Sequence, residues 1–431
     1  MKSKKIKILE EILRWMCIIV LKKYNPTVIG ITGSVGKTSA RDAIFLVLSE
    51  NFRVRKSRGN YNNEIGIPLT VIGAKSGGSS LFGWVRVLFH WFFVLIFPVE
   101  YPEVLVLEMS IDRPGDMTYL MSFIPVDIGV VTTLSNAHVE FFRDIEQIAK
   151  EKGILIASLP QGGVAVLNAD DKRVSAMDHR TNAMVLRYGC APHADVHASG
   201  IMLRRNGNDA SVHFKVNHEG RTVPVRLPHV IATHQVPSVL AALTVGIALK
   251  LNLVEMAHTL KSYVPPEGRM RRLVGINHTT IIDDTYNASP KAMRCAIDTL
   301  KDLTERRSIA VLGDMLELGE NEKEEHENIA ESIFEKKIDL FFAVGERMET
   351  AYHVLREKGF PQDKLFYFED PTLAGQKVQQ ILRTGDIVLV KGSQGMRMEK
   401  VVEKFLAATE NAGDLLCRQS KSWKAKPFVK P

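Results

Sequence analysis

The sequence lacks the cysteine pairs that zinc sites and disulfide frameworks require. Its 431 residues contain only Cys17, Cys190, Cys295 and Cys417, and no two of them form a CxxC pair. Scattered cysteines are typical of a reducing compartment, so we expect a cytosolic protein without structural zinc or disulfides. Short-period repeats and long low-complexity tracts are also missing, which argues against a solenoid or an extended disordered chain.

Two further signals are absent. No secretory leader is recognisable, because Glu10 and Glu11 interrupt the basic N-terminus and no small-residue cleavage site follows. An Asn-Lys-x-Asp string, which reads guanine in nucleotide switches, is also missing. These absences favour neither a secreted protein nor a GTPase.

Positive charge is concentrated at the two ends of the chain. Residues 1–24 carry a net charge of +5 and residues 411–431 carry +4, out of +7 for the whole chain, which leaves −2 for the remainder. Basic ends on a nearly neutral body do not indicate a nucleic-acid binder, and they fit an anionic lipid surface at least as well.

The longest apolar run covers residues 81–97 and reads LFGWVRVLFHWFFVLIF. Its 17 residues are near the lower limit for crossing a bilayer, and it contains Arg86 and His90. A membrane span here would put the strands expected at 27–32 and 104–108 on opposite sides of the bilayer, although both should belong to one domain. We therefore expect a segment that lies in the membrane interface, with its tryptophans at headgroup depth. The pattern of residues 1–24 predicts a basic amphipathic helix, which we also expect to lie in the membrane interface. The alternative is that both segments are buried helices or an oligomer contact.

The 45% hydrophobic and 24% charged composition is that of a globular protein, and the length allows two or three domains. Strand-like runs alternate with helix-like stretches, which predicts an α/β fold with parallel sheets. The predicted strands are 27–32, 104–108, 128–132 and 164–168, then 280–283, 308–312, 340–344, 364–368 and 387–390.

Short alternating segments between residues 193 and 226 predict antiparallel hairpins, and a helix is expected over 235–249. The break at Pro265-Pro266-Glu267-Gly268 suggests a linker. We therefore predict a P-loop-type central ATPase domain with a parallel sheet, followed by a Rossmann-like doubly wound domain. The expected limits are 1–24 for the N-terminal helix, 25–265 for the central domain with an apolar insertion at 81–98, 266–410 for the second domain, and 411–431 for a basic tail.

A glycine-rich turn follows the first predicted strand and precedes a helix expected over residues 38–49. It reads Gly33-Ser34-Val35-Gly36-Lys37-Thr38-Ser39. Backbone N–H groups at a helix start bind phosphate oxygens, a lysine adds a compact positive charge, and a threonine hydroxyl can bind Mg²⁺. The strict phosphate-loop pattern has a glycine at the position of Ile31. The prediction therefore depends on the shorter string from Gly33 to Thr38. The alternative is an ordinary glycine turn.

Polar side chains follow the next strands of the predicted first sheet. Glu108 ends one strand and His138 follows another, so both are expected at the carboxyl edge, where ligands bind in open parallel sheets. A carboxylate there can reach the Mg²⁺ that bridges nucleotide phosphates. A solvated glutamate and a structural histidine are the alternatives, and Lys152 would ordinarily be a solvated helix charge.

Three polar strings follow strands of the second predicted sheet: residues 283–290, 312–319 and 391–398. The first of them, Asp283-Asp284-Thr285-Tyr286-Asn287-Ala288-Ser289-Pro290, offers carboxylates, an aromatic ring and an amide for a ribose and base. Its alternative is a capped helix start, with Asn287 or Ser289 as the N-cap.

Together these motifs resemble the Mur ligases from about residue 27 to about residue 405. The resemblance extends to Tyr61-Asn62-Asn63-Glu64-Ile65-Gly66-Ile67-Pro68 and Gly268-Arg269-Met270, and it is most similar to the branch that adds D-alanyl-D-alanine to a muramoyl tripeptide. It implies that ATP phosphorylates a carboxylate to an acyl phosphate, which an amine then attacks to give an amide, ADP and phosphate. ATP and Mg²⁺ are the implied cofactors.

The resemblance also implies roles for individual residues. Lys37, Lys152, His138 and Glu108 would be catalytic, and Thr38, Glu108, His138 and Lys152 as a carbamate would hold metal. Nucleotide contacts would come from Gly33, Ser34, Gly36, Lys37, Thr38, Ser39, Arg269, Asp283, Tyr286 and Asn287, and substrate contacts from Asn62, Asn63, Lys391, Ser393 and Arg397.

The sequence departs from that family in several places. Ser238 stands where the family carries an adenine-binding asparagine, and Gln394 replaces a more usual arginine. The phosphate loop begins so early that we expect no N-terminal nucleotide-sugar domain. Together with the apolar run, this keeps open a ligase that acts on a lipid-linked or other envelope acceptor, peripheral on the inner face of the membrane.

A non-enzymatic nucleotide-binding module is the third alternative. We expect a cytoplasmic monomer that acts on muramoyl-peptide and amino-acid or dipeptide substrates, does not bind nucleic acid, and has a membrane surface as a candidate partner. The sequence does not identify the amine, the acceptor or the oligomeric state.

Overall fold

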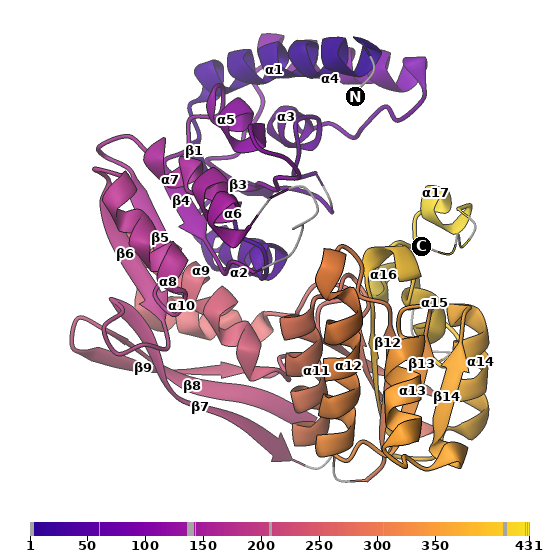
Figure 1. Ribbon diagram of the computed structural model, residues 1–431. Coiled ribbons are helices and arrows are strands. Elements are labelled where there is room, and N and C mark those ends of the chain that lie inside the picture. Colours follow the sequence, from indigo (N-terminus) through magenta and orange to yellow (C-terminus); the bar gives the residue numbers. More distant parts are fainter. Residues whose placement is uncertain are drawn as a thin grey trace. The chain divides into compact units, whose positions relative to one another are not determined.

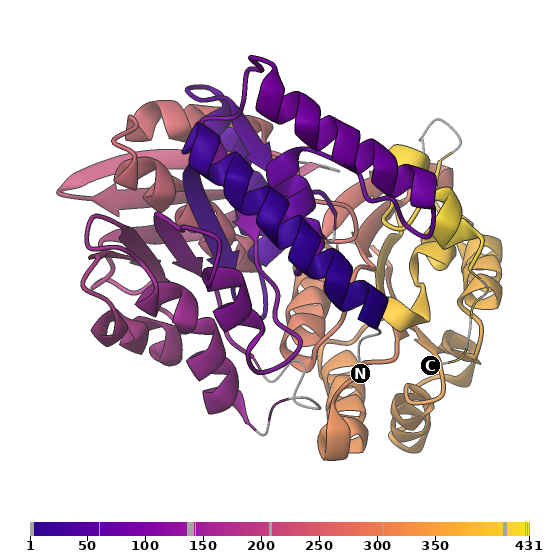
Figure 2. The same ribbon diagram turned by 90° about the horizontal axis from the view of Figure 1, so that it is seen from above.

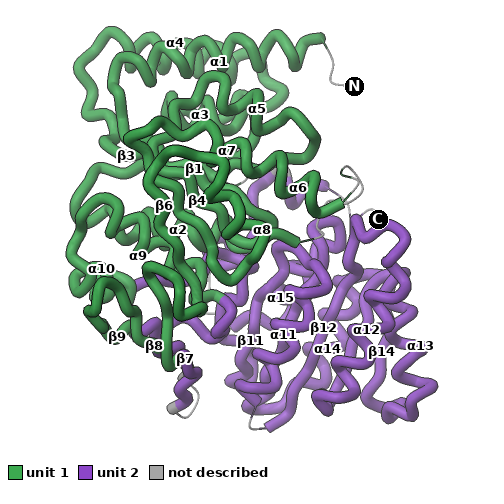
Figure 3. Tube along the Cα trace, turned by 60° about the vertical axis from the view of Figure 1, so that its left-hand side comes forward, with its two compact units in different colours: residues 1–200, 214–225, 235–261 green, residues 201–213, 226–234, 262–431 purple. Residues whose placement is uncertain are grey.

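The computed structural model describes residues 4–59, 61–135, 142, 144–206, 209–304, 306–407, 412–426, 428 and 430. Two compact units divide the chain (Figures 1 and 3). Unit 1 comprises residues 1–200, 214–225 and 235–261, and unit 2 comprises residues 201–213, 226–234 and 262–431. Three strands of the central hairpin region contribute residues to both units, so the domain limits expected from the sequence stay predictions.

The first sheet has nine strands in the order β2-β3-β1-β4-β5-β6-β7-β8-β9. Its first six strands pair in parallel. Four of them correspond to the predicted apolar strands, whereas β2 and β6 are only partly buried and were not predicted. These strands are β1 (Thr27–Thr32), β2 (Val54–Lys56), β3 (Val104–Glu108), β4 (Ile128–Val131), β5 (Val164–Asn168) and β6 (Met184–Gly189).

The hairpin region consists of β7 (Val196–Asn206), β8 (Asp209–His218) and β9 (Arg221–Leu227). Glu219 and Gly220 join β8 to β9 with φ values of 47° and 74°, as a type I′ hairpin turn requires. The predicted hairpins are confirmed, and the strands are longer than the short segments expected from the sequence.

Helices accompany the strands of unit 1. The predicted helix after the phosphate loop is confirmed as α2 (Lys37–Ser49), and the helix expected over 235–249 is α9 (Val236–Ala248). The others in this part of the chain are α1 (Lys4–Tyr24), α3 (Gly66–Ile72), α4 (Leu81–Ile96), α5 (Asp116–Met121), α6 (Ile145–Lys152), α7 (Ile154–Ala157), α8 (Lys172–Ser175) and α10 (Leu253–Thr259).

The apolar run and the N-terminal segment form α4 and α1, which lie side by side on unit 1 (Figures 1 and 2). Each helix buries one stripe of side chains in the core and leaves other apolar residues exposed. Among the described residues, no helix combines the length and the apolarity that crossing a bilayer demands.

Unit 2 contains a six-stranded sheet in the order β10-β11-β15-β12-β13-β14. Only β10 runs antiparallel to its neighbour, and the other pairs are parallel. The strands are β10 (Arg271–Val274), β11 (Thr280–Asp284), β12 (Ser308–Gly313), β13 (Leu340–Val344), β14 (Leu365–Phe368) and β15 (Ile387–Lys391).

Both faces of this sheet are covered. Ala310 and Leu312 of β12 belong to one apolar cluster, and Ile309 and Val311 belong to another, because alternate side chains of a strand point to opposite faces. Helices α11 (Pro290–Leu303), α12 (Glu322–Glu335) and α13 (Glu349–Glu357) supply the first cluster, and α14 (Pro371–Ile381) and α15 (Glu399–Val402) supply the second. The doubly wound prediction is confirmed. The chain continues through α16 (Ala412–Leu415) and α17 (Lys421–Lys424).

Candidate active site

The phosphate loop between β1 and α2 has the backbone that glycine permits. Gly33 and Gly36 have φ values of 141° and 88°. A Cβ atom on Gly33 would lie 1.9 Å from Thr132 Oγ1, so no larger residue fits there. The loop is fixed to the neighbouring strand end, because Ser34 N donates to Thr133 O at 2.7 Å. No side chain caps the N-terminus of α2, which leaves that helix end suited to an anion.

The Lys37 side chain folds back over this loop. Its ammonium group donates to Gly33 O at 2.8 Å and to Ser34 O at 3.3 Å. The positive charge therefore lies directly beside the turn whose N–H groups would bind phosphate. Ser39, in the first turn of α2, is buried.

Glu108 ends β3 and reaches the start of α2. The Thr38 hydroxyl donates to the two Glu108 carboxylate oxygens, at 3.2 and 3.1 Å. Glu108 is only 4% exposed, and Arg41 Nη1 pairs with its Oε2 atom at 3.2 Å. Asn62 Nδ2 reaches Glu108 Oε1 at 3.5 Å and donates to Ser110 Oγ at 2.8 Å. The structure thus brings Thr38, Glu108 and Asn62 together at the carboxyl end of β3.

Arg41 was missed by the sequence reading. It lies one helical turn after Thr38, and that spacing is the only signal that could have pointed to it, because residues three apart share a helix face. Asn63 has a different local environment: its Oδ1 atom accepts from Gly66 N at 2.9 Å at the start of α3.

Lys152 lies at the last position of α6 and is 4% exposed. Burial and the nearby positive charge of Lys37 lower the pKa of this amine well below its usual value, against the smaller raising effect of Asp112 and Glu151. The sequence alone would have left Lys152 solvated. His138 lies outside the described residues.

Magnesium prefers oxygen ligands, and the pair formed by Thr38 and Glu108 supplies a hydroxyl and a carboxylate beside the phosphate loop. These donors fit the ion. Across the part of the chain that the structure describes, no group of three or more His, Cys, Asp or Glu side chains is arranged around a metal position. Phosphate oxygens and water would complete the shell of an ion held by this pair.

In unit 2, most residues predicted from the sequence gather beyond the carboxyl ends of β11 and β15. Asp283 is fully buried and accepts from Gly268 N at 3.0 Å and from Thr285 Oγ1 at 2.6 Å. Burial raises the pKa of Asp283 to about 6, and these hydrogen bonds limit the rise. The Tyr286 ring lies 4.0 Å from the Arg269 guanidinium carbon.

Residues 391–398, which follow β15, pack against the loop that follows β11. Lys391 Nζ pairs with Asp284 Oδ2 at 2.6 Å and donates to Asn287 O at 2.9 Å. Ser393 Oγ accepts from Leu316 N at 2.9 Å. At the start of α11, Ser289 makes no side-chain cap, so the capped-helix alternative is wrong for that residue. Asn287 Oδ1 accepts from Ala288 N, which precedes the helix.

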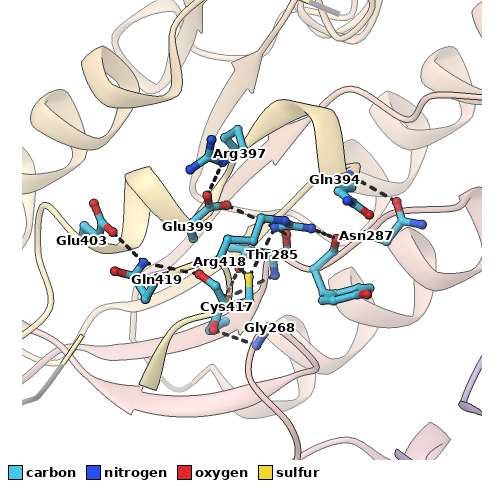
Figure 4. Close-up of polar contacts among 12 residues, drawn as sticks. Gly268, Thr285, Asn287, Gln394, Arg397, Glu399, Glu403, Cys417, Arg418 and Gln419 are labelled. Atoms are coloured by element: carbon cyan, nitrogen blue, oxygen red, sulfur yellow. Dashed lines mark hydrogen bonds and ion pairs between the residues drawn. The ribbon is translucent and has the colours of Figure 1, made fainter. Parts of the chain in front are cut away.

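The C-terminal segment adds residues that the sequence reading missed (Figure 4). The Arg418 side chain is 4% exposed, and its guanidinium donates to Thr285 O at 3.1 Å and to Tyr286 O. It also pairs with Glu399 Oε2 at 3.2 Å, and Arg397 pairs with Glu399 Oε1 at 2.5 Å. Glu399, 1% exposed, is therefore neutralised by two arginines. No sequence motif marked Arg418, which was assigned only to a basic tail.

Replacing Arg418 by alanine should lower the free energy of unfolding by roughly 2–4 kcal/mol, because a buried carboxylate loses one partner and two carbonyl groups lose donors. Urea unfolding of the full chain would measure this. Lys421→Ala, a change at an exposed cation of the same segment, is the control and should have almost no effect. In the double variant with Glu399→Gln, part of the loss should be recovered. Equal stability of Arg418→Ala and wild type would contradict the assigned contacts.

The chain is similar to known proteins over most of its length. A profile for the "Mur ligase middle domain" matches residues 93–246, and one for the "Mur ligase, glutamate ligase domain" matches residues 268–394. UDP-N-acetylmuramoyl-tripeptide--D-alanyl-D-alanine ligase of Mycobacterium tuberculosis (strain ATCC 25618 / H37Rv) is 32% identical over 403 residues, which are 88% of this chain and 73% of the relative. The chain belongs to the Mur ligase family.

Further relatives indicate the branch of the Mur ligase family to which the chain is similar. The ligase of the same name from Bacillus subtilis (strain 168) is 28% identical over 90% of this chain and 77% of its own length. The structure of MurF ligase from Thermotoga maritima in complex with ADP matches with a TM-score of 0.75 and 26% identity, over 92% of this chain and 83% of that one. The chain is thus a MurF-like, ATP-dependent, ADP-forming ligase of peptidoglycan precursor synthesis.

Proposed function

We propose that the protein activates a substrate carboxylate with the γ-phosphate of ATP and joins the resulting acyl phosphate to an amine. The observation that carries this proposal is the hydrogen-bonded pair of Thr38 and Glu108 beside a phosphate loop covered by the Lys37 ammonium. A carboxylate is a poor electrophile, and phosphorylation supplies its leaving group. The protein's contribution is then positioning and charge stabilisation.

In this proposal the backbone N–H groups of Gly33 and Gly36 bind phosphate oxygens, and Ser34, whose N–H is bonded to Thr133 O, contributes its hydroxyl group. Ser39 lies behind this loop, and Lys37 neutralises charge as the γ-phosphoryl group leaves. Thr38 and Glu108 hold one Mg²⁺, and His138 together with carbamylated Lys152 holds a second. Bound Mg²⁺ would stabilise the negative charge on the phosphate oxygens. Arg41 Nη1 pairs with Glu108 Oε2 and orients this carboxylate toward Thr38.

The residues of unit 2 take the remaining roles. We assign nucleotide contacts to Arg269, Asp283, Tyr286 and Asn287, which the structure holds in one loop system. We assign recognition of the incoming amine substrate to Lys391, Ser393 and Arg397, and peptide contacts to Asn62 and Asn63. Lys391 and Arg397 are both ion-paired, so a substrate carboxylate would have to compete with Asp284 and Glu399.

For substrates we propose a muramoyl tripeptide and D-alanyl-D-alanine, the compounds that appear in the names of the relatives. The experiment is ADP release measured with a coupled assay, combined with mass spectrometry of the product. ADP release that requires both the peptide and the dipeptide, with an amide product of the combined mass less water, supports the proposal. If the protein bound nucleotide but released no ADP with any acceptor, the result would contradict this proposal and support a non-enzymatic nucleotide-binding module.

A second candidate acceptor is a lipid-linked wall precursor, met by a protein lying peripherally on the inner face of the membrane. The specific observation that favours it is the apolar surface of α4, where Phe82 and Phe89 are 81% and 70% exposed. A panel of acceptors with and without a lipid anchor decides between the two. Higher kcat/KM for the anchored acceptor in vesicles favours the second candidate, and equal use of the soluble nucleotide-linked acceptor favours the first.

A further inference from the structure

Helices α1 and α4 form one continuous layer on unit 1 (Figure 2). α1 buries Leu13, Met16, Cys17, Val20 and Leu21, and α4 buries Val87, Trp91 and Val94. These residues belong to the same core cluster as α3 and the first sheet. The layer is therefore a packed part of unit 1, and its outer surface is a fixed surface of the protein.

Polar contacts join the two helices. Trp91 Nε1 donates to Met16 O at 3.0 Å, and its ring lies 5.4 Å from the Trp15 ring. At the ends of both helices, Lys23 Nζ donates to Leu95 O at 2.7 Å and Tyr24 OH donates to Val94 O at 2.5 Å. The carbonyl groups that end α4 are thus satisfied by α1, so the pair holds its geometry without covering its outer face.

That outer face is strongly apolar. Among the described residues, thirteen of the twenty exposed large hydrophobic side chains lie on α1, on α4 or at Phe97. In α4 they follow helical spacing, with Leu81, Val85, Phe89 and Phe92 on one side. A soluble monomer rarely exposes an apolar patch larger than a few hundred Å², and each aromatic side chain alone offers roughly 150–250 Å². The full set is Ile6, Ile8, Ile12, Trp15, Leu81, Phe82, Val85, Leu88, Phe89, Phe92, Phe93, Ile96 and Phe97.

The charges around this face are mostly positive, because α1 carries six lysine and arginine residues against Glu10 and Glu11. Lys4, Lys5 and Lys7 are exposed near the start of α1, and Lys22 is exposed near its end. In α4 the only ionisable residues are Arg86 and His90, one turn apart and both exposed. Two copies of such a face would bring these cations together, whereas anionic lipid headgroups would neutralise them. The charge pattern therefore selects a membrane surface over a second copy of the chain.

The length of α4 also fits a helix that lies along a bilayer. Its 16 residues extend for about 24 Å, less than the roughly 30 Å of a hydrocarbon core, and one side is already packed against α1. Exposed Phe and Trp side chains with lysines at the border are the composition of interfacial helices.

We propose that the outer face of α1 and α4 is a monotopic docking surface for a bilayer containing anionic lipid, with Phe89 and Phe93 inserted below the headgroups and the lysines of α1 at headgroup level. This surface deepens the lipid-linked candidate of the proposed function, but it does not depend on turnover. Vesicle binding and ligation are measured separately, so failure of the docking surface and failure of the proposed function can be distinguished.

The test is co-sedimentation of the full chain with vesicles of phosphatidylcholine containing 30% phosphatidylglycerol. Binding should exceed that to pure phosphatidylcholine vesicles by at least tenfold and should weaken at high salt, since headgroup attraction is screened. Phe89→Asp with Phe93→Asp should lower vesicle affinity at least tenfold. Both side chains are exposed, so this variant should fold with an unchanged melting temperature and unchanged ADP release on soluble substrates. Phe334→Asp, at an exposed phenylalanine of unit 2, is the matched control and should bind like wild type.

Lipids brominated in their acyl chains give a second readout. Trp15, 58% exposed, should be quenched by them, and Trp15→Phe should remove most of that quenching. Absence of vesicle binding by the wild type would overturn the proposal. So would a stable dimer in sedimentation velocity that Phe89→Asp with Phe93→Asp dissociates, because that result would make the face a contact between two copies.

Discussion

Replacing Lys37 by alanine should lower kcat/KM for ATP-dependent ligation by roughly 10²–10³-fold, the usual cost of removing one charged group that stabilises a transition state. The Lys37 ammonium lies within hydrogen-bond distance of Gly33 O and Ser34 O, directly beside the positions that phosphate oxygens would take. Coupled measurement of ADP release under substrate saturation and at limiting ATP would separate the loss in kcat from the loss in KM.

The control for Lys37 is Lys172→Ala, which removes an exposed lysine of α8 in the same unit. It should leave kcat/KM within about twofold of wild type. Thermal unfolding of each variant shows whether the fold is intact. Wild-type turnover in a correctly folded Lys37→Ala variant would remove the phosphate loop from the mechanism.

Replacing Lys152 by alanine should be as severe, at roughly 10²–10³-fold in kcat. The proposed carbamate forms when the neutral amine attacks carbon dioxide and releases a proton to solvent, which turns a cation into a carboxylate-like ligand. Burial favours this reaction because it lowers the pKa of Lys152 well below its usual value. Wild-type activity should therefore fall in buffer depleted of carbon dioxide and return with bicarbonate.

Three measurements test the carbamate directly. ¹³C-labelled bicarbonate should give a carbamate carbon signal in wild type that Lys152→Ala lacks. Short carboxylic acids should partly restore the alanine variant, because they can occupy the vacated space as metal ligands. Lys150→Ala, two residues earlier on α6 and exposed, should keep both the signal and the activity. Full activity of Lys152→Ala without added acid would contradict the role.

The lowered pKa of Lys152 also has a consequence for stability. The unfolded chain holds this proton up to about pH 10.4, whereas the folded chain releases it at lower pH. Between the two pKa values the folded state binds fewer protons, so the unfolding free energy rises with pH. In buffer free of carbon dioxide, the stability of wild type relative to Lys152→Met should increase as pH rises through that window.

The fold was largely predictable because its signals are local. Apolar runs such as 104–108 and 340–344 become fully buried parallel strands, and the glycine turn before Lys37 requires positive φ angles wherever it occurs. The pairing of Thr38 with Glu108 was also predictable, because the carboxyl ends of neighbouring parallel strands meet at one edge.

Other features of the site could not be read in this way. Arg41 carries no motif of its own, and its ion pair with Glu108 depends on how α2 packs against β3. Lys152 looks like any helix lysine, and only the surrounding packing removes it from water. Ser289, one of the two residues named as an alternative cap, makes no side-chain hydrogen bond at the start of α11.

The sequence by itself determined the α/β alternation, the phosphate loop, the Mur ligase motifs and the presence of two unusually apolar, basic segments. Each of these depends on residues a few positions apart, so local conformational preference and hydrophobic period are sufficient to specify them. Only the tertiary structure decided that Arg418 pairs with Glu399 and also bonds to Thr285, which lies 133 residues before Arg418 in the sequence. The tertiary structure also decided which side of α4 stays uncovered after α1 packs on it. Such outcomes follow from burial and charge compensation between distant segments, and no local pattern encodes them.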